Sequence, residues 1–79
     1  MRFEVTEPAE RDLADLDKKT QRRIKAVLDR LLTYPQAIDL KKLQGSPERW
    51  RVRAGDWRVI LRIDREQGVL YVLRIRHRR

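Results

Sequence analysis

The stretch WRVRAGDWRVILRID, from Trp50 to Asp64, decides the fold because its apolar and charged residues alternate. Alternation with a period of two is typical of β-strands. On the first strand, Trp50 and Val52 share one face, while the opposite face carries Arg49, Arg51 and Arg53. Ala54-Gly55 marks a tight turn into a second strand. The stretch therefore predicts a β-hairpin with one apolar face and one face of arginines.

The same alternation continues toward the C-terminus. On the second strand, one face carries Trp57, Val59, Leu61 and Ile63, and the other carries Arg58, Ile60 and Arg62. The segment DREQG, Asp64 to Gly68, reads as a turn into a last strand. Strict alternation along that strand places Val69, Tyr71, Leu73 and Ile75 on the apolar face. It places on the other face Leu70, Val72, Arg74, Arg76 and Arg78.

Upstream of the hairpin, the sequence predicts one short strand and two helices. Residues 3–5 read as the strand, with Thr6 as helix cap and Pro8 in the first helical turn. The second helix follows the i, i+3, i+4, i+7 pattern of Ile24, Val27, Leu28, Leu31 and Leu32. The second helix ends at Tyr34-Pro35, because a residue before proline is disfavoured in a helix. The two helices meet around residues 18–20. Residues 35–47 read as irregular.

The predicted order is strand, two helices and three strands, within a single domain over residues 1–79. Consecutive strands in this order favour an antiparallel sheet, and the apolar side of that sheet needs a cover. We therefore expect an α+β fold in which an antiparallel helical hairpin packs on a small twisted antiparallel sheet.

The composition restricts the classes of site. The chain has no cysteine, which excludes disulfides and thiolate metal sites and fits a reducing cytoplasm. His77 is the only histidine, so we expect neither a metal site nor a cofactor. No apolar run approaches the roughly 20 residues that span a membrane.

The net charge is +8, and its excess is concentrated after Pro47. If both tryptophans face the helices, alternation sends one set of basic residues to the opposite side, here called the arginine face. Like charges on neighbouring strands repel, so this face favours an anionic ligand. Nucleic acid and an acidic protein segment both fit, and a solvated basic surface stays an alternative. The arginine face is predicted to contain Arg49, Arg51, Arg53, Arg58, Arg62, Arg74, Arg76 and Arg78.

Three segments resemble the RelE/ParE superfamily of toxins from toxin–antitoxin systems. They are LKKLQG at 40–45, WRVRAGDWRVILRID at 50–64 and VLYVLRIRHRR at 69–79. The resemblance implies a β-α-α-β-β-β fold and an antitoxin partner that neutralises the toxin. For RelE-like members it implies metal-free cleavage of messenger RNA, typically on the ribosome. For ParE-like members it implies inhibition of DNA gyrase without nuclease activity. The ending RIRHRR is more similar to the RelE branch.

The resemblance also implies roles for individual residues. Arg58 matches the arginine that stabilises the transition state, and Arg78 matches the arginine that faces the phosphate or leaving group. Arg49 and Arg51 fall where RelE-like chains often have lysines, and arginine cannot act as a base, so we interpret them as phosphate-binding. We interpret Arg53, Arg62, Arg74 and Arg76 as RNA-binding too. His77 is the acid/base candidate because its ordinary pKa lies near neutrality.

Other side chains leave alternatives open. Many RelE-like chains continue to a tyrosine beyond the His-Arg pair, whereas this sequence ends at Arg79. An attenuated relative that only binds RNA or antitoxin therefore stays an alternative. Tyr71 is predicted to lie in the core, and so are Trp50 and Trp57. Glu48 and Asp56 are weak candidate bases and better candidates for ion-pair partners of arginines.

Overall fold

The computed structural model describes residues 2–33, 40–43, 45 and 48–78. Strand β1 (Arg2–Val5) leads into helices α1 (Glu7–Ala14) and α2 (Lys18–Thr33). Four strands follow, and they are β2 (Leu40–Lys42), β3 (Arg49–Ala54), β4 (Trp57–Asp64) and β5 (Val69–His77). The predicted α+β order is confirmed, and β2 adds a short strand within a segment that the sequence predicted to be irregular.

The five strands form one sheet in the order β1-β5-β4-β3-β2. β2 through β5 pair antiparallel, as predicted, whereas β1 pairs parallel with β5. The sheet is therefore mixed rather than wholly antiparallel. The two helices cause the difference, since they form a crossover that returns the chain to its starting end before the last strands are added.

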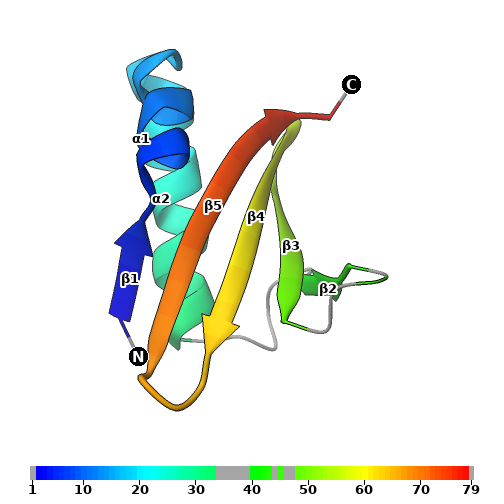
Figure 1. Ribbon diagram of the computed structural model, residues 1–79. Coiled ribbons are helices and arrows are strands. Elements are labelled where there is room, and N and C mark those ends of the chain that lie inside the picture. The colour runs from blue at the N-terminus through cyan, green and yellow to red at the C-terminus, as the bar shows by residue number, and fades with distance from the viewer. Residues whose placement is uncertain (1, 34–39, 44, 46–47, 79) are drawn as a thin grey trace.

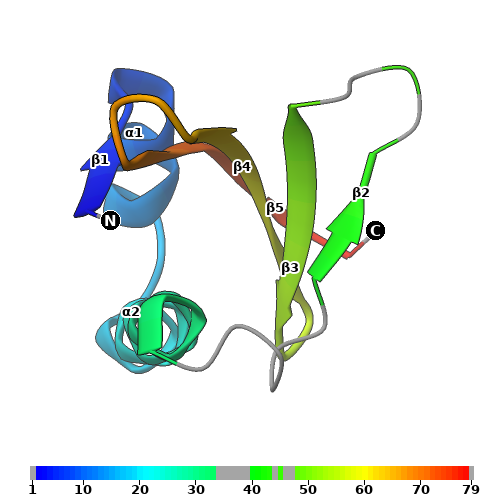
Figure 2. The same ribbon diagram turned by 90° about the horizontal axis from the view of Figure 1, so that it is seen from below.

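The helices lie on one side of this sheet. α2 packs across one face, and α1 continues beyond the end of β1 along the side of β5 (Figure 1). The view from below shows that no described element covers the opposite face of β3, β4 and β5 (Figure 2). The molecule thus has a face packed on helices and an open face.

The core forms between α2 and the inner face of the sheet. Ile24, Leu28 and Leu31 of α2 are buried at the spacing that the helical pattern predicted. They pack in one cluster with sheet residues, and Trp50 and Trp57 are partly buried against it as predicted. The buried sheet residues of the cluster are Val52, Ala54, Val59, Leu61, Leu70, Val72 and Ile75.

The ends of the helices differ from the prediction in two places. Thr6 occupies the N-cap position of α1 as predicted, but its hydroxyl makes no capping bond to the helix and donates instead to the carbonyls of Val72 (2.8 Å) and Leu73 (3.1 Å). α2 begins at Lys18, and the carboxylate of Asp17 accepts the Thr20 amide at 2.8 Å as an N-cap. The hydrogen bonds from Thr20 lower the pKa of Asp17.

A β-bulge in β5 changes which of its residues face the helices. Ile60 of β4 pairs with Arg74, while the next residue, Leu61, pairs with Val72, so Leu73 is an extra residue. Strict alternation predicted Leu70 and Val72 on the open face, but both are buried in the core. The prediction that Tyr71 lies in the core is likewise wrong, because the bulge places it opposite Arg62.

The hairpin between β3 and β4 closes with two residues. Ala54 pairs with Trp57, which leaves Gly55 and Asp56 as the turn. Gly55 has φ +63°, and a side-chain carbon added to it would lie 2.7 Å from an Arg23 nitrogen. Glycine is therefore favoured here by the backbone conformation, while the flexible end of the Arg23 side chain could move to admit a larger residue.

Candidate nucleic-acid interface

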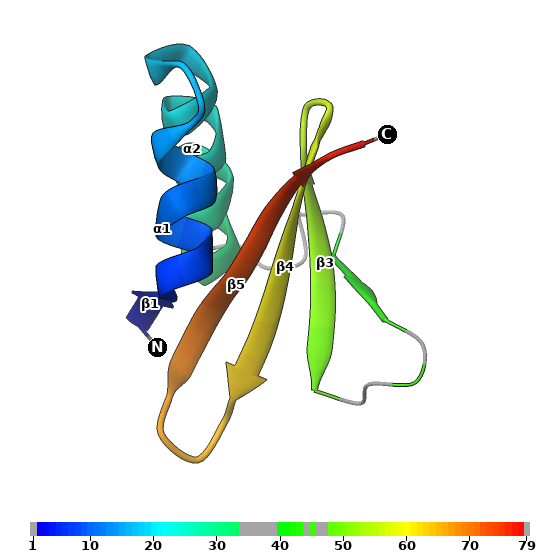
Figure 3. The same ribbon diagram turned by 45° about the horizontal axis from the view of Figure 1, so that its top comes forward.

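Cross-strand pairing arranges the arginine face in rows. Arg53, Arg58 and Arg76 are direct partners across β3, β4 and β5, and we refer to them as the arginine row. The next row contains Arg51, Ile60 and Arg74, and a third contains Arg49, Arg62 and Tyr71. Neighbouring strands lie about 4.8 Å apart, so each row brings its three residues close together. Figure 3 shows these three strands side by side, with the helices beside and behind them.

The arginine row forms no ion pair with the described residues. Within the described residues, none of Arg53, Arg58 and Arg76 forms an ion pair with a carboxylate, and the same holds for Arg49 and Arg51. Arg58 sits in the middle and is partly buried, and its Nε is a buried donor without a hydrogen-bond partner. Buried donors are nearly always paired, so this unpaired Nε between two other arginines is an unfavourable feature of the row as it stands.

Two other arginines of the face have weak carboxylate partners. Arg62 lies 4.0 Å from Glu48, and Arg78 lies 3.9 Å from Asp56. Both carboxylates are well exposed, and pairs of this kind contribute little stability. Glu48 and Asp56 therefore act as the ion-pair partners that the sequence suggested. Arg78 also donates its backbone N–H to the Asp56 carbonyl at 2.8 Å, which fixes it beside the β3–β4 turn.

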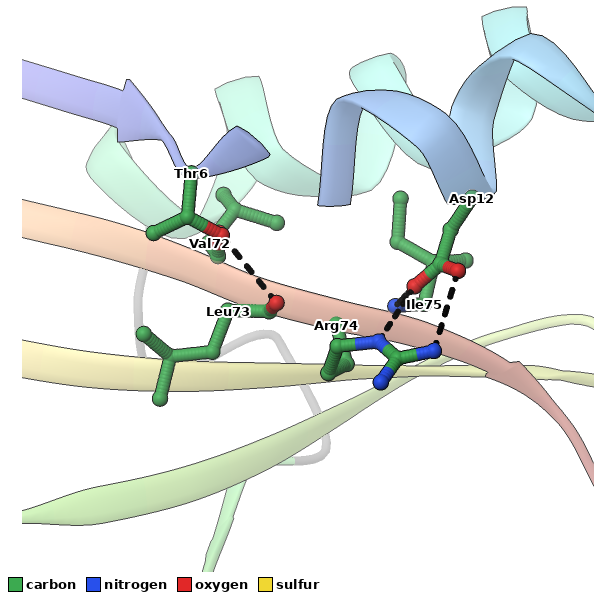
Figure 4. A network of polar contacts seen from close by, with 6 residues as sticks. All are labelled: Thr6, Asp12, Val72, Leu73, Arg74 and Ile75. Carbon is green, nitrogen blue, oxygen red and sulfur yellow. Dashed lines mark hydrogen bonds and ion pairs between the residues drawn. The ribbon is translucent and has the colours of Figure 1, made fainter. Parts of the chain in front are cut away.

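Arg74 differs from the rest because α1 holds its guanidinium. Its Nε and Nη2 donate to the two oxygens of Asp12 at 2.9 and 3.2 Å (Figure 4). Asp12 also accepts the Ile75 amide at 2.9 Å, and the hydrogen bonds from Arg74 hold its pKa below the ordinary value. Arg74 was predicted to bind RNA, but in this structure it attaches α1 to β5 beside the bulge.

The structure places His77 apart from the arginine row. His77 pairs with Trp57, and the two rings meet edge to face with centroids 5.0 Å apart. It lines a hollow of about 290 Å³ together with helix residues Lys19, Thr20 and Arg23. His77 is exposed at the end of β5, but its position in the pairing pattern is that of the helix side. Arg58 lies on the opposite side of the sheet, so these two predicted catalytic residues are not brought together.

Tyr71 is the residue of this face that the sequence reasoning missed. Its ring lies beneath the guanidinium of Arg62, whose central carbon is 4.4 Å from the ring centroid. Leu70, Val72 and Ile75 carried a signal for it, because apolar residues spaced by two and then three indicate a bulge in a strand. The open face thus combines arginines with one aromatic side chain.

The described parts of the chain have neither a metal-binding cluster nor a membrane-spanning helix. They contain no group of three or more histidine, aspartate or glutamate side chains that could hold a metal ion. Neither helix is long and apolar enough to cross a membrane.

Comparison with known proteins gives one consistent relationship. Residues 3–79 match the family model described as ParE toxin of type II toxin–antitoxin system, parDE. The protein named RelE1 from Methanocaldococcus jannaschii is 38% identical over 52 residues, which are 62% of this chain and 58% of that protein. The chain thus spans less than two thirds of this curated relative.

Solved structures agree with the fold. The RelE–RelB complex of Pyrococcus horikoshii OT3 superposes with a TM-score of 0.81 at 28% identity, over 98% of this chain and 93% of that one. The RelBE2 toxin–antitoxin complex of Mycobacterium tuberculosis gives 0.70 at 27% identity, over 98% and 96%. Both structures are complexes of a toxin with its antitoxin.

Proposed function

Since the chain belongs to the RelE/ParE family of type II toxins, we propose that it is an endoribonuclease that cleaves messenger RNA on the ribosome. The observation that carries this proposal is the arginine row. Three arginines directly opposite one another, without acidic partners among the described residues, are unfavourable for the isolated fold. They become favourable when a phosphate binds between them, since arginine donates to phosphate oxygens in a fixed fork.

The proposed reaction needs no metal. The 2′-oxygen of a ribose attacks the adjacent phosphorus, and the bond from phosphorus to the 5′-oxygen breaks. The proton of the 2′-OH passes to a base, and the leaving 5′-oxygen takes up a proton. DNA lacks the 2′-OH and is spared.

The arginines supply the electrostatic part of this mechanism. Negative charge grows on the phosphate oxygens in the transition state, and fixed donors aimed at that charge lower the barrier. Arg58 has the central position in the arginine row, so it is assigned this role. Arg53 and Arg76 lie on either side of it, and Arg51 is in the next row. Arg78 is held near the same end of the sheet by Asp56 and is assigned to the leaving-group side.

The proposed cleavage also needs a base for the proton of the 2′-OH and an acid for the leaving 5′-oxygen. His77 is the acid/base candidate from the sequence, but it lies on the helix side with Trp57. We therefore assign His77 to the packing of the β5 end and expect its removal to matter less than the removal of Arg58.

An antitoxin partner is part of this proposal. The solved relatives from Pyrococcus horikoshii and Mycobacterium tuberculosis are toxins complexed with antitoxins. The open face of β3, β4 and β5 offers such a partner both positive charge and the partly buried Ile60. We propose that a cognate antitoxin neutralises this chain by covering the arginine row.

Primer extension on a reporter message in a reconstituted translation reaction tests the activity. We expect cuts within the reading frame that require ribosomes. Arg58→Ala should reduce their rate about 100- to 1,000-fold, the typical effect of removing one transition-state donor. Arg30→Ala, which removes an exposed arginine of α2, is the matched control and should leave the cuts unchanged.

One observation favours a second function. The matching family model is that of ParE toxins, which suggests inhibition of DNA gyrase. Intact messages together with loss of supercoiling by purified gyrase would support this function and would contradict the nuclease proposal.

A further inference from the structure

The third row of the arginine face includes an aromatic ring, which phosphate binding does not require. It contains Arg49, Arg62 and Tyr71, with the Arg62 guanidinium lying over the Tyr71 ring. We propose that Arg62 and Tyr71 form a stacking site for an RNA base, separate from the arginine row that holds the phosphate. This inference rests on the proposed function, because it assigns a base-binding site to the same RNA.

The position of the pair comes from the bulge. Without the extra residue Leu73, strict alternation would send Tyr71 toward the helices, away from Arg62. Because Tyr71 is on the open face, an aromatic ring stands beside a strip of arginines. Aromatic side chains interleaved with basic ones are the usual composition of surfaces that bind single-stranded RNA.

The spacing fits a strand of RNA that runs along β4. Arg58 and Arg62 are four residues apart on that strand, which corresponds to about 13 Å. Ile60 lies between them on the same face and has an apolar, partly exposed side chain. A phosphate on Arg58 and a base on the Arg62–Tyr71 pair can therefore belong to one short segment of single-stranded RNA.

The Tyr71 ring, more than the Glu48 carboxylate, orients the Arg62 guanidinium. Its only ion-pair partner among the described residues is Glu48, at 4.0 Å, which is too long for a hydrogen bond. The ring contact at 4.4 Å is a close cation–π geometry. A guanidinium held flat in this way presents a planar surface, and RNA bases stack on guanidinium planes as well as on aromatic rings.

Equilibrium binding can separate base stacking from phosphate binding. The probes are a fluorescein-labelled single-stranded RNA and a strand of the same length whose riboses carry no bases. Anisotropy is measured over a range of salt concentrations for the wild type and for Tyr71→Leu, Tyr71→Phe, Arg62→Lys and Arg58→Ala. Tyr71→Phe retains the ring and is the matched control, while Arg62→Lys retains the charge but removes the plane.

The stacking site predicts different responses to the two probes. Tyr71→Leu should weaken binding of the RNA roughly 5- to 100-fold and leave binding of the base-free strand unchanged. Tyr71→Phe should bind both as the wild type does. Arg62→Lys should weaken only the RNA, with its salt dependence kept. Arg58→Ala should weaken both probes equally and reduce the slope of affinity against salt by about one.

Other results overturn the inference. Equal losses on both probes would mean that the Tyr71 ring contributes nothing specific to bases, and an unchanged affinity for RNA would mean that the ring contacts no base. If Arg58→Ala alters neither affinity nor salt slope, the proposed function fails, whereas the stacking site is still decided by the Tyr71 variants. A wild-type protein that binds neither probe overturns both.

Discussion

Asp12 makes the strongest connection between α1 and the sheet, and replacing it should destabilise the fold more than replacing its partner. Its carboxylate accepts two bonds from Arg74 and one from the Ile75 amide, all between 2.9 and 3.2 Å. The side chain of Asp12 is only 18% exposed, while that of Arg74 is 45% exposed. Asp12 is therefore more deeply buried than Arg74.

The expected costs follow from this difference in burial. Arg74→Ala removes a half-exposed ion pair, which contributes about 0.5–1 kcal/mol. Asp12→Ala removes the same pair and also leaves the partly buried Ile75 N–H without an acceptor, which adds about 1–3 kcal/mol. The total for Asp12→Ala is about 1.5–4 kcal/mol. Asp12→Asn keeps an oxygen for Ile75 and should cost about 1 kcal/mol.

Thermal unfolding followed by circular dichroism measures these differences. For a domain of this size, 1 kcal/mol corresponds to roughly 4–8 °C in Tm. We expect a larger decrease for Asp12→Ala, roughly 6–30 °C, than for Arg74→Ala and Asp12→Asn, each less than about 8 °C. Equal decreases for Asp12→Ala and Arg74→Ala would refute the reasoning, because they would show that the Ile75 amide needs no acceptor from α1.

Three further predictions concern the same parts of the fold. Since its bonds to Arg74 lower the pKa of Asp12 from 3.8, this carboxylate contributes stability above that pH and loses it as the pH falls through the lowered value. Urea midpoints should thus fall below about pH 4 in the wild type and fall less in Asp12→Asn. Thr6→Val should cost about 1 kcal/mol in urea unfolding, because the Val72 and Leu73 carbonyls lose a donor, whereas Thr6→Ser should not. Gly55→Ala should cost about 1–2 kcal/mol because of the positive φ, and a Tm within 2 °C of wild type would contradict this expectation.

The sequence predicted the parts of the fold that depend on local patterns. The helical period of α2, the alternation in β3 and β4 and the turn at Gly55 are all confirmed. These patterns suffice because each element buries one continuous face of its own.

The errors arose where distant segments decide the outcome. The side to which Tyr71 points depends on a bulge at Leu73. The Leu73 carbonyl accepts from Thr6, and the Ile75 amide donates to Asp12, both from the other end of the chain. The ion pair of Arg74 with Asp12 joins residues 62 positions apart, and nothing in the local pattern of β5 indicates it. Pairwise contacts at that separation are a property of the assembled fold.

The placement of β5 has a consequence for the biosynthesis of this toxin. β5 is the last of the described strands to be translated, yet it lies inside the sheet, between β1 and β4. A nascent chain that has reached only β4 holds β1 and α1 without the strand to which they attach. It also lacks Arg76, the third member of the arginine row. Long-range contacts of this kind form late and together. The surface that we propose to be toxic is therefore assembled only after β5 has been made, so a nascent chain that ends before β5 does not present it.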